Sequence, residues 1–164
     1  MVRSFKREDR FVSVEMRMLT LSVLLGIVQI IAASHAASLQ RGYRWTASPR
    51  DEQVEPLWGV AGRLERALRN FSETFPLIAA VVHAAQLVGT HNALTVWGAQ
   101  LSFWARVAYV PLYAAGVPLI RSLVWNVGMI GIMLFIVALF FGVSNNDPHL
   151  PDGFREDLLS AARE

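Results

Sequence analysis

The chain alternates between long stretches without formal charge and shorter polar segments. Residues 18–40 form a first uncharged run of 23 residues, long enough as a helix at ~1.5 Å per residue to cross a ~30 Å hydrocarbon layer. A second uncharged run, residues 74–105, is interrupted at residues 89–92 by Gly-Thr-His-Asn, which predicts two helices joined by a turn. The predicted helices are residues 18–38, 64–88, 93–115 and 123–144, with a second turn at Gly116-Val117-Pro118.

Two polar segments complete the organisation. Residues 40–62 contain prolines, glycines and charges of both signs, and are interpreted as an ordered loop. Residues 145–164 are predicted to form a polar C-terminal tail. Four apolar helices joined by two short turns and one loop predict an all-α protein, a single domain over residues 1–144 that forms a four-helix up-down bundle across a membrane. The basic residues before the first helix also fit a cleaved secretory signal, but Glu8, Asp9 and Glu15 favour a retained helix.

Composition narrows the possible functions. Of the 164 residues, 54% are hydrophobic and only 17% are charged, which argues against an ordinary soluble enzyme. With no cysteine, the chain has no disulfide, thiolate metal site or cysteine nucleophile, so any thiol must come with a ligand. The four histidines lack the spacing of metal ligands, and no metal site is predicted. The net charge of +2 is too small, and the basic residues are too scattered, to indicate a nucleic-acid footprint, so no nucleic-acid partner is predicted.

Ionisable residues inside the predicted spans are the first sign of function, because such residues are costly in lipid unless they are paired or solvated. Glu73 and Arg106 both lie roughly 21–24 Å from the turn at residues 89–92, on adjacent antiparallel helices, and are expected to pair. Arg66, Asn70 and Glu73 share one helix face by spacing.

A second polar stripe on the next helix faces the first in this interpretation. It consists of Ser102, Arg106, Tyr109 and Tyr113, with Arg121 entering at the same end. Cations outnumber the single acid, which predicts a water-filled, anion-accepting cleft at the loop end of the bundle. The alternative is a structural Glu73–Arg106 ion pair beside tyrosines of an interfacial aromatic belt.

Three stretches resemble a known family of membrane proteins. Residues 65–77, ERALRNFSETFPL, resemble the signature region of the MAPEG proteins, the membrane-associated proteins in eicosanoid and glutathione metabolism. Residues 103–113, FWARVAYVPLY, are similar to the arginine and tyrosine segment of that family, and residues 118–122, PLIRS, to its arginine-bearing start of the fourth helix. The resemblance covers roughly residues 18–144 and implies a four-helix membrane bundle that forms a homotrimer, with glutathione held at subunit boundaries.

The resemblance also implies roles for individual residues. Glutathione would be bound by Arg66, Asn70 and Glu73, with Arg106, Tyr109 and Tyr113 lining the site. Arg121 is the candidate that holds the sulfur as thiolate, and Arg41 is a looser match to a family arginine near the thiol. Glutathione has two carboxylates and one ammonium, so several arginines and one acid suit it.

The implied function is a glutathione-dependent membrane transferase or peroxidase acting on a lipophilic electrophile or hydroperoxide. Its partners would be glutathione, a lipophilic small molecule and membrane lipid. The competing hypothesis is a non-enzymatic membrane protein of the same fold that binds an amphipathic anion or lipid. The absence of a retrieval motif at the C-terminus favours a multi-pass protein of the bacterial inner membrane.

Overall fold

The computed structural model describes residues 12–51 and 54–141. Within them the chain forms four long helices and one short helix, and no strand. The helices are α1 (Val14–Arg41), α2 (Tyr43–Thr46), α3 (Gly59–Val88), α4 (Ala93–Ala115) and α5 (Pro118–Phe141). The all-α prediction is therefore confirmed. The predicted tail, residues 145–164, lies outside the described residues.

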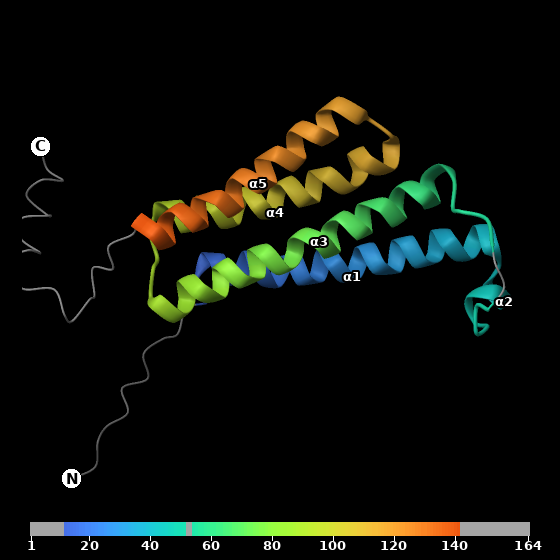
Figure 1. Cartoon of the computed structure of the whole chain (residues 1–164), viewed down its shortest axis with the longest axis horizontal. Helices are drawn as coiled ribbons and strands as arrows, with labels where there is room; N and C mark the ends of the chain where they lie inside the picture. The colour runs from blue at the N-terminus through green and yellow to red at the C-terminus, as the bar shows by residue number, and fades with distance from the viewer. Residues whose placement is uncertain (1–11, 52–53, 142–164) are drawn as a thin grey trace, which may run out of the picture.

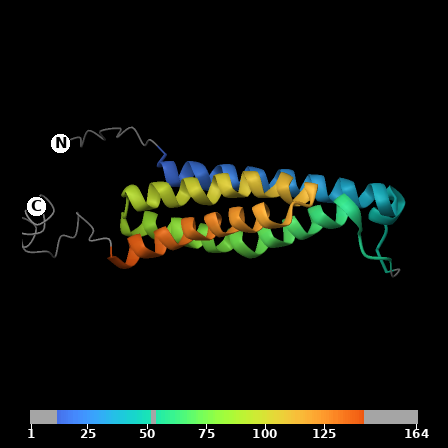
Figure 2. The same cartoon turned by 90° about the horizontal axis from the view of Figure 1, so that it is seen from above.

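The four long helices run side by side along one axis. Figure 1 shows α1 beside α3 and α4 beside α5, with the α3–α4 turn at one end and the α4–α5 turn at the other. Seen from above, α4 lies over α1 while α5 lies over α3 (Figure 2). Contacts between helices are most extensive for α4 with α5 and for α1 with α3, and α4 also contacts both α1 and α3. This arrangement brings the loop after α1 and the α4–α5 turn to the same end, called here the loop end.

Local sequence signals explain where the helices begin and end. Asn92 and Thr95 form a capping box that starts α4, each side chain bonding the other residue's backbone N–H. Gly89 and Gly116 end α3 and α4 with φ of 68° and 80°, a left-handed conformation that glycine adopts without steric cost. Pro118 is the first residue of α5, a position where a proline's missing N–H leaves no hydrogen bond unmade.

Three helices begin before their predicted first residues. α1 starts at residue 14 instead of 18, α3 at 59 instead of 64, and α5 at 118 instead of 123. Each extra turn carries polar residues or a proline, so an analysis based on uncharged runs stops short of it. The earlier start of α5 matters for the site, because Arg121 and Ser122 belong to the helix itself. The loop prediction also missed the single turn of α2.

Apolar packing dominates the end of the molecule opposite the loop end. There, Leu19, Val82, Ala85, Ala99 and Phe135 form one buried cluster drawn from all four long helices. α4 and α5 approach each other closely at Gly98 and Gly131, since a Cβ on Gly131 would lie 2.6 Å from the Gly98 carbonyl oxygen. Small residues permit such close helix packing in membranes. By length and hydropathy, α1, α3 and α5 can each cross a membrane.

Candidate functional site: a polar cleft at the loop end

An open cleft of ≈ 380 Å³ lies near the α4–α5 turn. Three helices line it: α3 contributes Asn70, α4 contributes two tyrosines, and α5 contributes four residues. The lining residues are Asn70, Tyr109, Tyr113, Arg121, Ser122, Trp125 and Asn126. Four of the eight predicted site residues are thus brought together: Asn70, both tyrosines and Arg121.

Two arginines and two tyrosines make a connected series that starts in the cleft at Arg121 and ends at Arg106, which does not itself line the cleft. The guanidinium carbon of Arg121 lies 4.3 Å from the centre of the Tyr113 ring. That ring meets the Tyr109 ring edge to face, with centroids 5.3 Å apart. The guanidinium carbon of Arg106 lies 5.9 Å from the Tyr109 ring. Cation–π contacts hold a guanidinium in place without neutralising its charge, so Arg121 remains able to bind an anion.

Arg106 is oriented by a neighbour different from the one expected. Its Nη1 donates a 2.7 Å hydrogen bond to the Oδ1 of Asn70. The predicted ion pair between Arg106 and Glu73 is wrong. Among the described residues, one contact within 4.0 Å joins a basic to an acidic side chain, and it is the contact between His91 and Glu15. The reason is the rotation of α3: apolar and small residues such as Ala67 and Phe71 take the buried face. Asn70 then lies at the edge of that face, whereas Glu73 is exposed.

Comparison with models of protein families shows which family the chain belongs to. A model of the MAPEG family matches residues 18–141, which covers all four long helices from the first uncharged run onward. The chain belongs to the MAPEG family. A comparison with curated proteins gives no significant match. As a MAPEG protein, the chain is an integral membrane protein of a family with glutathione-related transferase and peroxidase activities.

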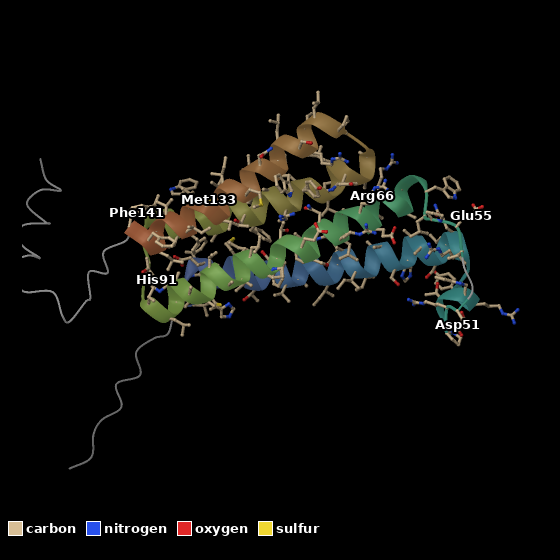
Figure 3. All side chains as sticks on the ribbon, in the orientation of Figure 1. Asp51, Glu55, Arg66, His91, Met133 and Phe141 are labelled. Carbon is tan, nitrogen blue, oxygen red and sulfur yellow. The ribbon has the colours of Figure 1, made fainter. Side chains whose placement is uncertain are left out.

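The remaining predicted residues lie outside the cleft of this MAPEG chain. Arg66 and Glu73 on α3 are exposed and do not line the cleft, and Figure 3 shows Arg66 at the loop end, beside the α4–α5 turn. Arg41 ends α1, where its Nη2 donates a 3.1 Å hydrogen bond to the Glu55 carbonyl oxygen. Its guanidinium carbon also lies 4.8 Å from the Trp45 ring, so Arg41 helps to fold the loop.

Three residues of the cleft were missed by the sequence analysis as site residues: Ser122, Trp125 and Asn126. They follow Arg121 at helical spacing, a signal that becomes readable once α5 is known to start at Pro118. Trp125 lines the cleft from α5. Its indole Nε1 is buried and has no hydrogen-bond partner among the described residues. This N–H is therefore available to donate a hydrogen bond to a ligand in the cleft.

Proposed function

We propose that this MAPEG protein is a glutathione-dependent membrane transferase or peroxidase that acts on a lipophilic electrophile or hydroperoxide. Glutathione would bind as the thiolate in the cleft at the loop end. The observation that carries the proposal is the convergence of Arg121, Tyr113 and Asn70 on one open cleft. We further propose a homotrimer in a bacterial inner membrane.

The chemistry of the cleft suits glutathione. The side chains that line the cleft mainly carry hydrogen-bond donors: one guanidinium, two phenols, a hydroxyl, two carboxamides and the unpartnered indole N–H of Trp125. Carboxylates are acceptors, and a guanidinium binds them with two parallel hydrogen bonds. Arg121 and Asn70 are therefore assigned to bind the anionic parts of the tripeptide, and Tyr109 and Tyr113 to line its path.

Arg121 is assigned a second task at the sulfur. A nearby guanidinium stabilises the thiolate over the thiol and so raises the fraction of reactive nucleophile at neutral pH. In conjugation, the sulfur forms a bond to an electrophilic carbon while the leaving group departs with its electron pair. In peroxide reduction, the sulfur attacks the terminal oxygen, the O–O bond breaks to release an alcohol, and a second glutathione yields the disulfide and water.

The exposed charged residues of α3 support the proposed oligomer. Arg66, Arg69 and Glu73 are all exposed on a helix apolar enough to cross a membrane. Charged side chains within a membrane-spanning segment are energetically costly when they face lipid. A neighbouring copy of the chain would cover these residues and bring Glu73 to the glutathione ammonium at the subunit boundary. Arg41 does not line the cleft of its own chain, so its proposed role near the thiol requires a neighbouring copy.

The decisive experiment measures conjugation of glutathione to 1-chloro-2,4-dinitrobenzene, and reduction of cumene hydroperoxide, by the purified protein in detergent. Arg121→Ala should lose most activity while keeping its thermal stability. Arg17→Ala is the matched control: Arg17 is exposed at the other end of the molecule, and its Nε donates to the Val12 carbonyl oxygen. The control should keep full activity.

Two other outcomes would change the assignment. If glutathione raises the melting temperature but neither reaction is detected with either substrate, the chain is the non-enzymatic anion-binding protein of the competing hypothesis. If Arg121→Ala is as active as the parent, the thiolate role of Arg121 is wrong even though the reaction is real. Thermal unfolding of each variant, with and without glutathione, separates loss of binding from loss of fold.

A further inference from the structure

A second hollow lies between α4 and α5, which run side by side (Figure 1), and it is apolar where the cleft is polar. Its volume is ≈ 360 Å³, and six residues of α4 and one of α5 line it. None of them lines the cleft. By helical spacing, Gln100 and Trp104 in this hollow fall on the side of α4 away from Tyr109 in the cleft. The hollow, called here the α4–α5 groove, is therefore separate from the proposed glutathione site.

Two exposed tryptophans of α4, Trp97 and Trp104, line the groove. Trp104 is held in place from two sides. Its indole Nε1 donates a 2.9 Å hydrogen bond to the Oε1 of Gln100, and its ring meets the Phe103 ring edge to face, with centroids 5.0 Å apart. The wall of the groove is thus formed by contacts within α4 and needs no ligand to shape it.

Gln100 places a hydrogen-bond donor in this apolar groove. Because an indole N–H can only donate, the contact with Trp104 uses the amide oxygen and leaves the Nε2 as a donor. Among the described residues, this Nε2 has no hydrogen-bond partner, and Gln100 is half-buried. Lipid tails offer no acceptor, so an amide N–H that faces them costs free energy. Apolar and aromatic walls with a few polar groups are typical of small-molecule pockets.

The depth of Gln100 in the membrane indicates which acceptor it would meet. α4 packs against α1, α3 and α5, each of which can cross a membrane. Measured from Ala93, the first residue of α4, Trp97 lies ~6 Å along the axis and Gln100 ~10 Å. Trp97 is therefore near a bilayer boundary, where tryptophan is enriched. Side chains tilt toward the N-terminus of a helix, so the Gln100 amide extends toward this boundary, where the ester groups of phospholipids lie.

We propose that the α4–α5 groove binds one acyl chain of a membrane phospholipid, whose ester carbonyl oxygen accepts a hydrogen bond from the Nε2 of Gln100. The chain runs from Gln100 past Trp104 to Val127 on α5, toward the middle of the membrane. A second copy of the protein suits the groove less well. The exposed charges that need cover are on α3, whereas the described residues that line the groove carry no charge. The lipid site requires neither glutathione nor the cleft.

The test compares two phospholipids that differ only in the carbonyl oxygens: dioleoyl phosphatidylcholine and its ether-linked analogue. Each is titrated into the full chain in detergent, and native mass spectrometry measures the lipid bound per chain. The parent should bind one ester lipid per chain, about 2- to 10-fold more tightly than the ether lipid, as expected for one hydrogen bond between uncharged groups. Gln100→Met removes the donor and keeps the length of the side chain, so it should bind the two lipids equally.

A bulkier side chain in the groove gives a second, independent measurement. Val127→Phe fills the groove from α5 and should abolish saturable binding of both lipids. Val137→Phe is the matched control, because Val137 is on the same helix and is 38% exposed, against 39% for Val127, but does not line the groove. The control should bind both lipids as the parent does.

Three results would overturn the lipid site. One is a parent protein that binds the ester and ether lipids equally or without saturation. Another is a Gln100→Met protein that keeps the parent's preference for the ester lipid. The third is a Val137→Phe protein that loses lipid binding as fully as Val127→Phe does. Thermal unfolding in detergent checks the fold of every variant. If Gln100→Met does not fold, the parent and the two valine variants still decide the matter.

Discussion

Arg106 on α4 and Asn70 on α3 are joined by a hydrogen bond of 2.7 Å from Nη1 to Oδ1. The bond connects two of the three helices that line the cleft. The guanidinium also lies 5.9 Å from the ring of Tyr109, a residue that lines the cleft together with Asn70. Asn70 thus both lines the cleft and orients the arginine beside it.

Replacing Asn70 with alanine should lower the free energy of unfolding by about 1.5–3 kcal/mol, since a hydrogen bond to a partly buried charged group is lost. Ser72→Ala is the control on the same helix, because Ser72 is exposed and bonds only the Leu68 carbonyl oxygen of its own helix. Equilibrium denaturation in detergent measures both variants. Equal losses in the two would mean that the bond between Arg106 and Asn70 contributes nothing specific.

The contact between Arg121 and Tyr113 predicts a difference between two substitutions of the tyrosine. Tyr113→Phe keeps the ring that lies 4.3 Å from the guanidinium carbon, whereas Tyr113→Leu removes it. A cation–π contact contributes about 0.5–2 kcal/mol, so the leucine variant should bind glutathione roughly 2- to 30-fold more weakly than the phenylalanine variant. Isothermal titration calorimetry measures the two affinities. Similar weakening by both variants would assign the effect to the tyrosine hydroxyl instead of the ring.

Glu73 supports a prediction about the ligand itself. Because Glu73 is exposed and the proposed partner of its carboxylate is the ammonium of glutathione, Glu73→Gln should change stability without ligand by no more than about 0.5 kcal/mol. Glutathione affinity should fall about 10-fold or more. A glutathione analogue with hydrogen in place of the ammonium is the matched probe: parent and variant should bind it equally. A parent that binds the analogue as tightly as glutathione would remove Glu73 from the ammonium site.

Much of the fold was predictable because lipid imposes a simple requirement, about 20 apolar residues in a row. The turn at residues 89–92 and the bounds of α4 follow from residues with strong local preferences, such as Asn92 and Gly116. The first turn of α1 was missed because Glu15 and Arg17 interrupt its apolar pattern, and the first turn of α3 because Gly59 and Gly62 are typical of a loop. Capping by Ser13, which sets the start of α1, depends on one hydroxyl contact with the Met16 N–H.

The candidate site was less predictable, because spacing along a helix gives relative directions and not the rotation of the helix in the bundle. Asn70 and Glu73 lie on one side of α3 by spacing, yet only Asn70 reaches Arg106. The rotation is set by the sum of small and apolar contacts, including Ala67 and Phe71, that no short motif encodes. The pairing of Glu15 with His91 is likewise a consequence of how α1 docks on the α3–α4 turn.

Two glycines on α5 provide the sharpest test of how the helices are held together. A Cβ built on Gly131 would lie 2.4 Å from the Ser102 Oγ, 2.6 Å from the Gly98 carbonyl oxygen and 2.8 Å from the Ser102 backbone nitrogen. Two of these neighbours are backbone atoms, so α4 and α5 must move apart to admit a methyl group. On Gly128, one turn earlier, the nearest atom would be the Ala105 Cβ at 3.4 Å, an ordinary contact.

Gly131→Ala should therefore destabilise the protein by about 1–3 kcal/mol through overpacking, and Gly128→Ala by much less, although both add the same methyl group to the same helix. The displacement should also weaken glutathione binding, because α4 and α5 carry Tyr113 and Arg121 on the two sides of the α4–α5 turn. Denaturation and calorimetry measure the two effects. If Gly131→Ala were as stable as Gly128→Ala, the close approach of Gly131 to Gly98 would not be a constraint on the fold.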